Sequence, residues 1–308
     1  MSLAKAWPLR GGLMAQFQDY LELCKPRVVA LMVFTALVGM LLAAPGEVAT
    51  ATLVFGTLGI ALVASSAAAI NQLADRHVDA VMARTRLRPL PTGHLEAWQV
   101  LCFATVVGIL GMAILLAYIN LLTAVLTLIS LVGYAAVYTL FLKHATPQNI
   151  VIGGAAGATP PLLGWTAVTG QVDPHALLLF LIIFTWTPPH FWALALYRKD
   201  EYAKVNIPML PVTHGDDYTR LYILLYTWLL TVVTALPYAT GMSGPIYLIS
   251  ALTLDAVFLY YAIALKLTRR RSLAIKTFVY SIVYLMLLFA ALLFDRYFPT
   301  LLSLFFSP

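Results

Sequence analysis

Long apolar runs that carry almost no charge recur along the whole chain of 308 residues, and they limit its fold more than any other feature. Each run is close to the ~20 residues that a helix needs to cross ~30 Å of hydrocarbon. Their leucine, alanine and phenylalanine content favours helices, which satisfy their own backbone hydrogen bonds in lipid. We therefore predict an all-α, polytopic membrane protein with nine transmembrane helices, at residues 28–44, 51–70, 98–118, 121–142, 150–166, 176–197, 221–238, 246–265 and 277–294.

The composition excludes the main alternatives to a membrane protein. Apolar residues make up 61% of the chain and charged residues only 10%, whereas soluble domains contain about 45–50% and about 25%. Too few charges remain to cover the surface of soluble domains, and the chain is too apolar for disorder. The two cysteines, Cys24 and Cys102, lack metal-ligand spacing and give no disulfide framework.

The basic residues define a topology for nine crossings. Of the 19 lysines and arginines, all but Arg296 lie in the N-terminal tail or in the second, fourth, sixth and eighth loops. The positive-inside rule makes that side cytoplasmic, so we expect a cytoplasmic N-terminus and a C-terminus on the opposite, periplasmic side. The net charge of +6 mostly reflects this topology and gives no reason to expect nucleic-acid binding.

Two long loops, residues 74–97 and 198–220, follow the second and sixth runs and end in similar Pro-, Thr- and His-containing strings. This parallel predicts that residues 28–142 and 150–265 are two copies of one four-helix unit, to which residues 277–294 are added. We expect a single transmembrane domain over residues 1–308, with residues 1–24 as a cytoplasmic tail. The first apolar run starts late and is followed by further spans, unlike a cleaved signal peptide.

The second predicted helix ends in a polar motif. Asn71, Asp75 and Asp79 are spaced at i, i+4 and i+8, so a helix places all three on one face. Two carboxylates one turn apart repel each other unless a cation lies between them. Oxygen ligands of this kind suit Mg²⁺, which binds a few carboxylates together with waters and substrate phosphates. An ordinary solvated loop with Asp–Arg pairs remains the alternative reading of this motif alone.

Basic residues on the same side complement this acidic motif. Arg84 and Arg88 offer bidentate donors for phosphate oxygens, and Lys143 ends the fourth predicted helix. The second long loop supplies Asp200, Tyr202 and Lys204. A membrane-embedded pocket that faces these groups would hold an apolar tail while a diphosphate meets metal and arginine. This arrangement is what an isoprenyl diphosphate requires.

These motifs resemble those of the UbiA superfamily of intramembrane prenyltransferases. Within it, the chain is most similar to the branch of protoheme IX farnesyltransferases, or heme O synthases. The strings that carry the resemblance are Cys24–Arg27, Asn71–Asp79, Arg84–Pro89, Thr146–Gly154, Pro160–Trp165, Trp186–Trp192, Tyr197–Tyr202 and Pro208–Pro211. The chain departs from the wider superfamily at Lys204, where many members have the second aspartate of a DxxxD motif, and this makes a second Mg²⁺ held by two carboxylates doubtful.

The resemblance implies a UbiA-type fold with a central cavity, and transfer of farnesyl from farnesyl diphosphate to a vinyl group of heme b, with water addition, to give heme O. It implies Mg²⁺ on Asp75 and Asp79, with Asp200 as a further ligand and Asn71 orienting a water or a carboxylate. The diphosphate would be bound by Arg84, Arg88, Lys143, Tyr202 and Lys204. It also implies a bacterial inner membrane, and a heme A synthase or an oxidase assembly factor as the recipient of the product.

The sequence leaves alternatives for the roles of two residues, His190 and Asp255, and for the function of the chain. His190 is a candidate heme-binding residue, and the prolines that precede it predict a break in the sixth helix; a hydrogen-bonded interface histidine is the alternative. Asp255 lies near the middle of the eighth helix, where a charge usually faces the protein interior. A related prenyltransferase that acts on a quinone precursor or a chlorin would share the diphosphate site. A transporter would instead have polar residues and broken helices near the midplane.

Overall fold

A computed structural model describes residues 12–44 and 46–306, and every regular element within these ranges is a helix. The basic residues Lys5 and Arg10 of the predicted tail lie outside the described residues. Within these ranges, eight helices are long and apolar enough to cross a membrane. Seven of them are α2 (Pro26–Ala43), α3 (Thr50–Val81), α4 (Ala97–Tyr118), α9 (Pro174–Tyr197), α12 (Asp216–Ala239), α13 (Pro245–Thr268) and α14 (Arg271–Phe306). The prediction of an all-α, polytopic membrane protein is confirmed.

The remaining long helix changes its winding along its length. It begins as α5 (Leu121–Val132), continues as a π-helix, η1 (Gly133–Leu142), and ends in the short α6 (Lys143–Ala145). In the π-helical part, the Thr139 hydroxyl donates to the carbonyl of Tyr134 over 2.8 Å. π-Helical segments are rare and occur frequently at functional sites. Here the segment leads directly to Lys143, and no sequence pattern predicted it.

The fifth predicted crossing is formed by α7 (Asn149–Ala158) and α8 (Pro160–Thr169), and the helical hydrogen bonds are interrupted between them although Thr159 keeps helical dihedral angles. Pro160 and Pro161 lack the N–H groups that would continue the hydrogen-bonding of α7. Among the carbonyls left without a helical donor is that of Ala156. It accepts hydrogen bonds from the hydroxyls of Thr159, at 2.8 Å, and Ser130, at 3.1 Å. Such replacement donors allow broken backbone inside a membrane protein.

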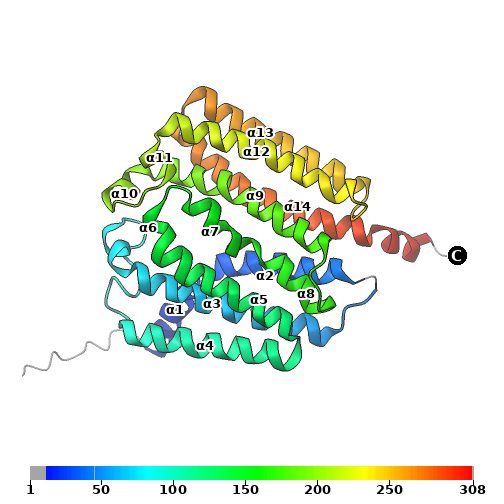
Figure 1. The fold of residues 1–308 in the computed structure, drawn as a ribbon, viewed down its shortest axis with the longest axis horizontal. Helices are drawn as coiled ribbons and strands as arrows, with labels where there is room; N and C mark the ends of the chain where they lie inside the picture. Colours follow the sequence, from blue (N-terminus) through cyan, green and yellow to red (C-terminus); the bar gives the residue numbers. More distant parts are fainter. Residues whose placement is uncertain (1–11, 45, 307–308) are drawn as a thin grey trace, which may run out of the picture.

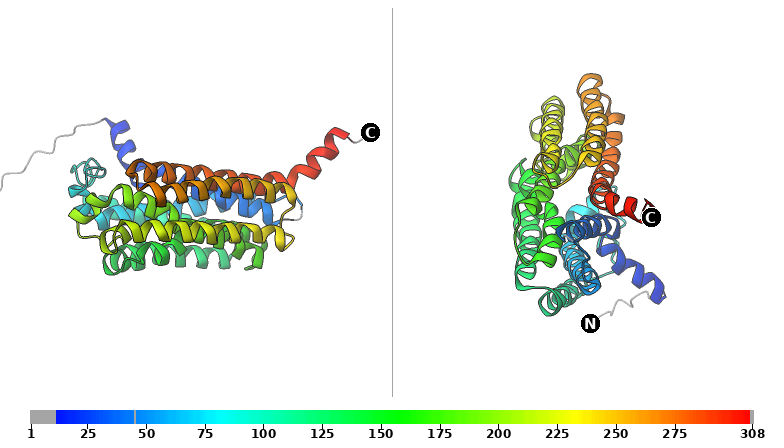
Figure 2. Two further views of the ribbon diagram at one scale, coloured as in Figure 1. Left: turned by 90° about the horizontal axis from the view of Figure 1, so that it is seen from above. Right: turned by 90° about the vertical axis from the view of Figure 1, so that its right-hand side faces the viewer.

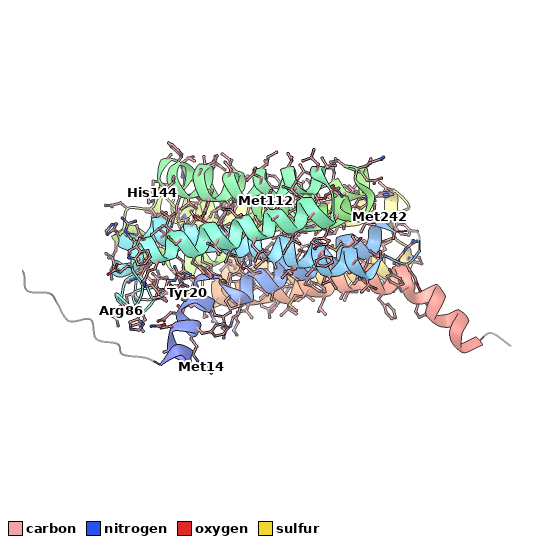
Figure 3. The ribbon with its side chains drawn as sticks, turned by 90° about the horizontal axis from the view of Figure 1, so that it is seen from below. Met14, Tyr20, Arg86, Met112, His144 and Met242 are labelled. Carbon is pink, nitrogen blue, oxygen red and sulfur yellow. The ribbon has the colours of Figure 1, made fainter. Side chains whose placement is uncertain are left out.

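The helices form one elongated bundle, and the long loops gather at one end of it. The segment 82–96, α6, α10 (Lys199–Lys204) and α11 (Leu210–Thr213) all lie at the left end in Figure 1. Seen along the bundle, the long helices are viewed end-on and run roughly parallel (Figure 2, right). Figure 3 shows Arg86 and His144 at this loop end and Met242 at the opposite end. The segments that carry the predicted diphosphate-binding residues therefore meet at one end.

One helix in the predicted tail was not expected. Helix α1 (Leu13–Leu23) projects from the bundle at an angle (Figure 2, left). The amide of Gln72 on α3 donates to the carbonyls of Glu22 and Leu23, over 3.0 and 3.3 Å. These carbonyls lie at the C-terminal end of α1, where backbone acceptors lack helical partners. The hydrogen bonds fix the junction of α1 and α2 against α3.

Candidate active site at the loop end of the bundle

The acidic motif lies on the last turns of α3. Because α3 extends to Val81, it carries Asn71, Asp75 and Asp79 on successive turns. Their exposed fractions are only 5%, 6% and 4%. Two carboxylates this deeply buried are costly unless each has a charged or hydrogen-bonding partner. The partners of Asp75 and Asp79 therefore define the organisation of the site.

Each aspartate pairs with a separate cation. The ammonium of Lys143 lies 2.6 Å from Oδ2 of Asp75, and Nη1 of Arg88 lies 2.6 Å from Oδ2 of Asp79. Both pairs involve Oδ2, and neither Oδ1 makes a hydrogen bond with a described residue. The Oδ1 atoms are also not among the buried, unpartnered atoms of the described side chains. One oxygen of each carboxylate is thus available for a ligand.

Asn71 connects this pair of carboxylates to two further elements. Its amide nitrogen donates to Oδ2 of Asp75 over 3.1 Å and to the hydroxyl of Thr139 over 3.2 Å. Its amide oxygen accepts a hydrogen bond of 2.6 Å from the ammonium of Lys25. Asn71 therefore holds the orientation of Asp75 and ties α3 to η1 and to the start of α2.

Lys25 is a site residue that the motif search did not identify. Its backbone is left-handed, with φ at 49°, in the short connection between α1 and α2. Burial and, to a lesser extent, repulsion from Arg88 and Lys143 lower the pKa of Lys25, whereas Asp75 and Asp79 raise it, and the net pKa is about 7. The sequence shows a lysine before a proline, but the contact with Asn71 depends on tertiary structure.

Lys25 also lines a large apolar cavity, so the charged cluster and the cavity adjoin each other. The cavity has a volume of about 660 Å³ and is lined by residues of α2, α3, α5, η1, α7, α8, α9 and α14. This lies within the range of about 300–1,000 Å³ that is usual for small-molecule sites. Near Lys25 its wall includes Tyr134 and Tyr138; the remaining wall is largely apolar. The arrangement suits a ligand with an anionic head and a long apolar tail.

Part of the second long loop contributes to the same end. Tyr202 on α10 is buried, with 5% of its surface exposed. Burial raises the pKa of its hydroxyl, and the nearby cations Arg84 and Arg198 oppose that rise. Arg84 itself is partly exposed, and burial lowers the pKa of its guanidinium. Tyr202 thus lies beside the segment that carries Arg84 and Arg88.

Asp200 and Lys204 are positioned differently. Both are exposed at the surface of α10. Oδ2 of Asp200 lies 2.8 Å from Nη2 of Arg271, and the Asp200 side chain is 72% exposed. The structure therefore pairs Asp200 with the start of α14, and its side chain makes no hydrogen bond or ion pair with the described residues around Asp75 and Asp79.

The buried carboxylates fit a hard divalent cation that is completed by a ligand. No group of three or more His, Cys, Asp or Glu side chains within residues 12–44 and 46–306 is arranged to hold a metal. Two carboxylates with available Oδ1 atoms match Mg²⁺, which keeps several waters and binds through one or two carboxylates plus phosphate oxygens. The donor set fits Mg²⁺ bound together with a diphosphate better than an all-protein metal site.

His190 lies in the wall of the cavity, on α9. The prediction that its neighbouring prolines break the helix is wrong, because α9 is continuous from Pro174 to Tyr197 with Pro188 and Pro189 inside it. Proline has a helical φ, and packed membrane helices tolerate the missing donors. Nδ1 of His190 lies 2.6 Å from the hydroxyl of Ser281 on α14.

Asp255 is buried on α13, outside the lining of the cavity. Its Oδ1 accepts a hydrogen bond of 2.6 Å from the hydroxyl of Tyr284, and its Oδ2 accepts one of 2.8 Å from the hydroxyl of Thr234. These partners come from α14 and α12. Asp255 therefore connects three helices away from the site.

Comparison with known proteins agrees with this geometry. The model of the UbiA prenyltransferase family matches residues 32–293. The fold and the site together define an intramembrane enzyme of this kind, and the chain belongs to the UbiA prenyltransferase family.

Relatives and solved structures give further detail. A curated protoheme IX farnesyltransferase of Hahella chejuensis is 63% identical over 94% of this chain and 97% of its own length. The protein of the same name from Legionella pneumophila is 60% identical over 92% and 96%. A structure of digeranylgeranylglyceryl phosphate synthase superimposes with a TM-score of 0.77 at 20% identity, covering 92% of this chain and 99% of that one. A UbiA homologue from Archaeoglobus fulgidus bound to GPP and Mg²⁺ gives 0.61 at 18% identity, covering 89% and 99%.

Proposed function

We propose that this chain transfers the farnesyl group of farnesyl diphosphate to a vinyl group of heme b, with water addition, to give heme O. The observation that carries the proposal is the buried Asp75–Asp79 pair, which adjoins a large apolar cavity through Asn71 and Lys25. A diphosphate at the carboxylates would place its isoprenyl tail in the cavity.

The diphosphate head would be held by the cations around the acidic pair. Lys143 and Arg88 already lie at Asp75 and Asp79. We add Lys25 to the predicted set because it lines the cavity and donates a hydrogen bond to Asn71. Arg84 and Tyr202 lie beside this group, while Asp200 and Lys204 would have to approach it from the surface of α10. Asp75 and Asp79, with Asp200 as a further ligand, would hold Mg²⁺, which when bound neutralises charge on the leaving diphosphate.

The residues of the chain would act on the two reaction stages in different ways. In the first stage the carbon–oxygen bond of the allylic diphosphate breaks, and Lys143, Arg88 and Lys25 stabilise the negative charge that develops on the leaving group. In the second stage the vinyl carbon of heme attacks the farnesyl cation, and water adds to the neighbouring carbon with loss of one proton. The apolar cavity would keep water away from the first cation until the new carbon–carbon bond has formed.

The heme acceptor is supported by the relatives, since curated proteins at about 60% identity over most of this chain carry the name protoheme IX farnesyltransferase. The archaeal structure titled with GPP and Mg²⁺ supports the metal and diphosphate part. We further propose a bacterial inner membrane, with the loop end and the N-terminus in the cytoplasm, and delivery of the product to a heme A synthase or to oxidase assembly.

The direct test is product analysis. Membranes that contain the chain are incubated with heme b, farnesyl diphosphate and Mg²⁺, and the extracted hemes are analysed by mass spectrometry against membranes without it. We expect heme O only when the chain is present. Prenylation of a hydroxybenzoate or a chlorin, with heme b unchanged, would overturn the choice of acceptor.

A further inference from the structure

His190 is held by groups that cover three of its sides. Its ring stacks on Trp186, with centroids 4.1 Å apart, and on Phe278, with centroids 4.6 Å apart. Its Nδ1 lies 2.6 Å from the Ser281 hydroxyl. The indole N–H of Trp186 donates to the carbonyl of Ser281 over 2.8 Å, which ties α9 to α14 at the same level. The remaining edge of the ring, which carries Nε2, is the one left for the cavity that His190 lines.

The hydrogen bonds of Ser281 assign the proton on this imidazole. The Ser281 hydroxyl lies 2.6 Å from the carbonyl oxygen of Phe278, which can only accept. A hydroxyl has a single proton. If that proton goes to Phe278, then the contact between Nδ1 and Ser281 is a hydrogen bond only when Nδ1 carries the proton. His190 is then the tautomer in which Nε2 has a lone pair and no hydrogen.

Proteins bind metals through imidazoles of this tautomer, in which one ring nitrogen carries the proton and the other has a free lone pair. Metal-ligating histidines almost always donate their other ring N–H to a fixed acceptor, which sets both tautomer and ring orientation. Nε2 makes no hydrogen bond with any described residue, and His190 is the only imidazole among the described residues that line the cavity. The stacked rings of Trp186 and Phe278 hold the plane of the imidazole, so that Nε2 would point along one direction into the cavity.

Resting on the proposed function, we propose that Nε2 of His190 is the axial ligand of the iron of heme b, and that Ser281 is the positioning residue that presents this nitrogen to the iron. The substrate class would then be iron porphyrins rather than porphyrins in general, because part of the binding energy comes from the iron–nitrogen bond. The ligand would also fix the position of the macrocycle in the cavity, which the reaction requires if one vinyl group is to meet the farnesyl carbon.

The test uses the full chain purified in detergent, without farnesyl diphosphate, titrated with ferric heme b and separately with metal-free protoporphyrin IX. We expect an imidazole-type absorption and electron paramagnetic resonance signature for heme in the wild type. In His190→Ala that signature should be lost and the Kd for heme should rise about tenfold or more, while the Kd for protoporphyrin should stay unchanged. Added imidazole should restore the signature in His190→Ala, which shows that the cavity is still folded.

Two variants of Ser281 test its role as the positioning residue. Ser281→Ala should raise the Kd for heme about tenfold, whereas Ser281→Thr keeps the hydroxyl and should bind like the wild type. His94→Ala, which changes a largely exposed histidine in the first long loop, is the matched control and should change neither signature nor Kd. An unchanged imidazole signature in His190→Ala, or equal wild-type affinities for heme and protoporphyrin, would overturn the inference.

The outcomes also separate this inference from the proposed function. If the wild type forms heme O but His190→Ala keeps the imidazole signature, only the ligand assignment fails. If the wild type prenylates another acceptor and binds no heme, the proposed function fails and the ligand assignment fails with it.

Discussion

The ammonium of Lys143 lies 2.6 Å from Oδ2 of Asp75, although Lys143 follows η1 and Asp75 is on α3. Both side chains are mostly shielded from water, with 12% and 8% of their surfaces exposed. The ammonium of Lys143 therefore compensates the charge of a buried carboxylate. In the proposed reaction, the same lysine contacts the diphosphate once Mg²⁺ and substrate are bound.

The first prediction concerns the stability that this pair provides without ligand. Removing one partner of a buried pair leaves an uncompensated charge and costs about 3–5 kcal/mol. We expect Lys143→Gln to lower the Tm of the detergent-purified protein in EDTA, and Mg²⁺ with inorganic diphosphate to recover part of the loss. Lys199→Gln is the matched control, because its pair with Asp216 has a similar length of 2.7 Å but is partly exposed and should contribute only about 0–1 kcal/mol. Equal losses of Tm in the two variants would contradict the prediction.

The second prediction concerns pH and Lys25. Its pKa is about 7 in the folded protein and 10.5 in the absence of burial. Between these values the unfolded chain binds more protons than the folded one, so the free energy of unfolding rises with pH in this window. We expect the wild type, without substrate, to gain stability from pH 7 to pH 10 relative to Lys25→Met, which lacks this titration. Thermal unfolding curves at several pH values measure the difference, and a constant difference across the window would refute the burial of Lys25.

The third prediction concerns Asp255, which connects α12, α13 and α14. Asp255→Leu removes the acceptor of the Tyr284 hydroxyl and of the Thr234 hydroxyl, and an unsatisfied buried donor costs about 1–3 kcal/mol. We expect a lower Tm but normal heme O formation per folded molecule, because Asp255 does not line the cavity. Asp255 and Tyr284 share one hydrogen bond. Tyr284→Phe should therefore lower the free energy of unfolding less in Asp255→Leu than in the wild type. Loss of turnover without loss of stability would assign Asp255 a catalytic role.

Sequence patterns predicted the long helices well, because hydrophobic length and charge placement are local properties. The same holds for Asn71, Asp75 and Asp79, whose spacing alone places them on one helical face. The interruption of the helical hydrogen bonds at Thr159 was not predicted, although Pro160 and Pro161 follow it directly, because an apolar run of the right length is interpreted as one helix. The predicted duplication of the four-helix unit stays a prediction.

Side-chain contacts between residues far apart in the sequence could not be predicted from local patterns. Lys25 meets Asn71, and Ser281 meets His190, across 46 and 91 positions. Both contacts depend on how helices pack, and the first also depends on a left-handed backbone at Lys25. Asp200 was predicted as a site residue from its position after the sixth predicted crossing, and this stays a prediction; its pair with Arg271 on α14 is a further long-range contact that the sequence did not indicate.

The acidic pair is tested most directly by turnover in Asp75→Asn and Asp79→Asn. Each change keeps the size of the side chain but removes a charged oxygen that would bind Mg²⁺, and the metal stabilises charge that appears only when the carbon–oxygen bond breaks. Asp200→Asn should reduce turnover less, because the Asp200 side chain is exposed and pairs with Arg271, so that it would serve only as an additional ligand. Glu47→Gln, on an exposed loop, is the control and should behave like the wild type.

The decisive measurement is kcat for heme O formation in folded, detergent-purified protein at saturating Mg²⁺, together with the Kd for heme b. We predict that kcat falls about 100-fold or more in each aspartate variant, that the double variant is little worse than either single one, and that heme binding is unchanged. Near-normal kcat in both Asp75→Asn and Asp79→Asn would contradict the assignment of the metal and diphosphate site.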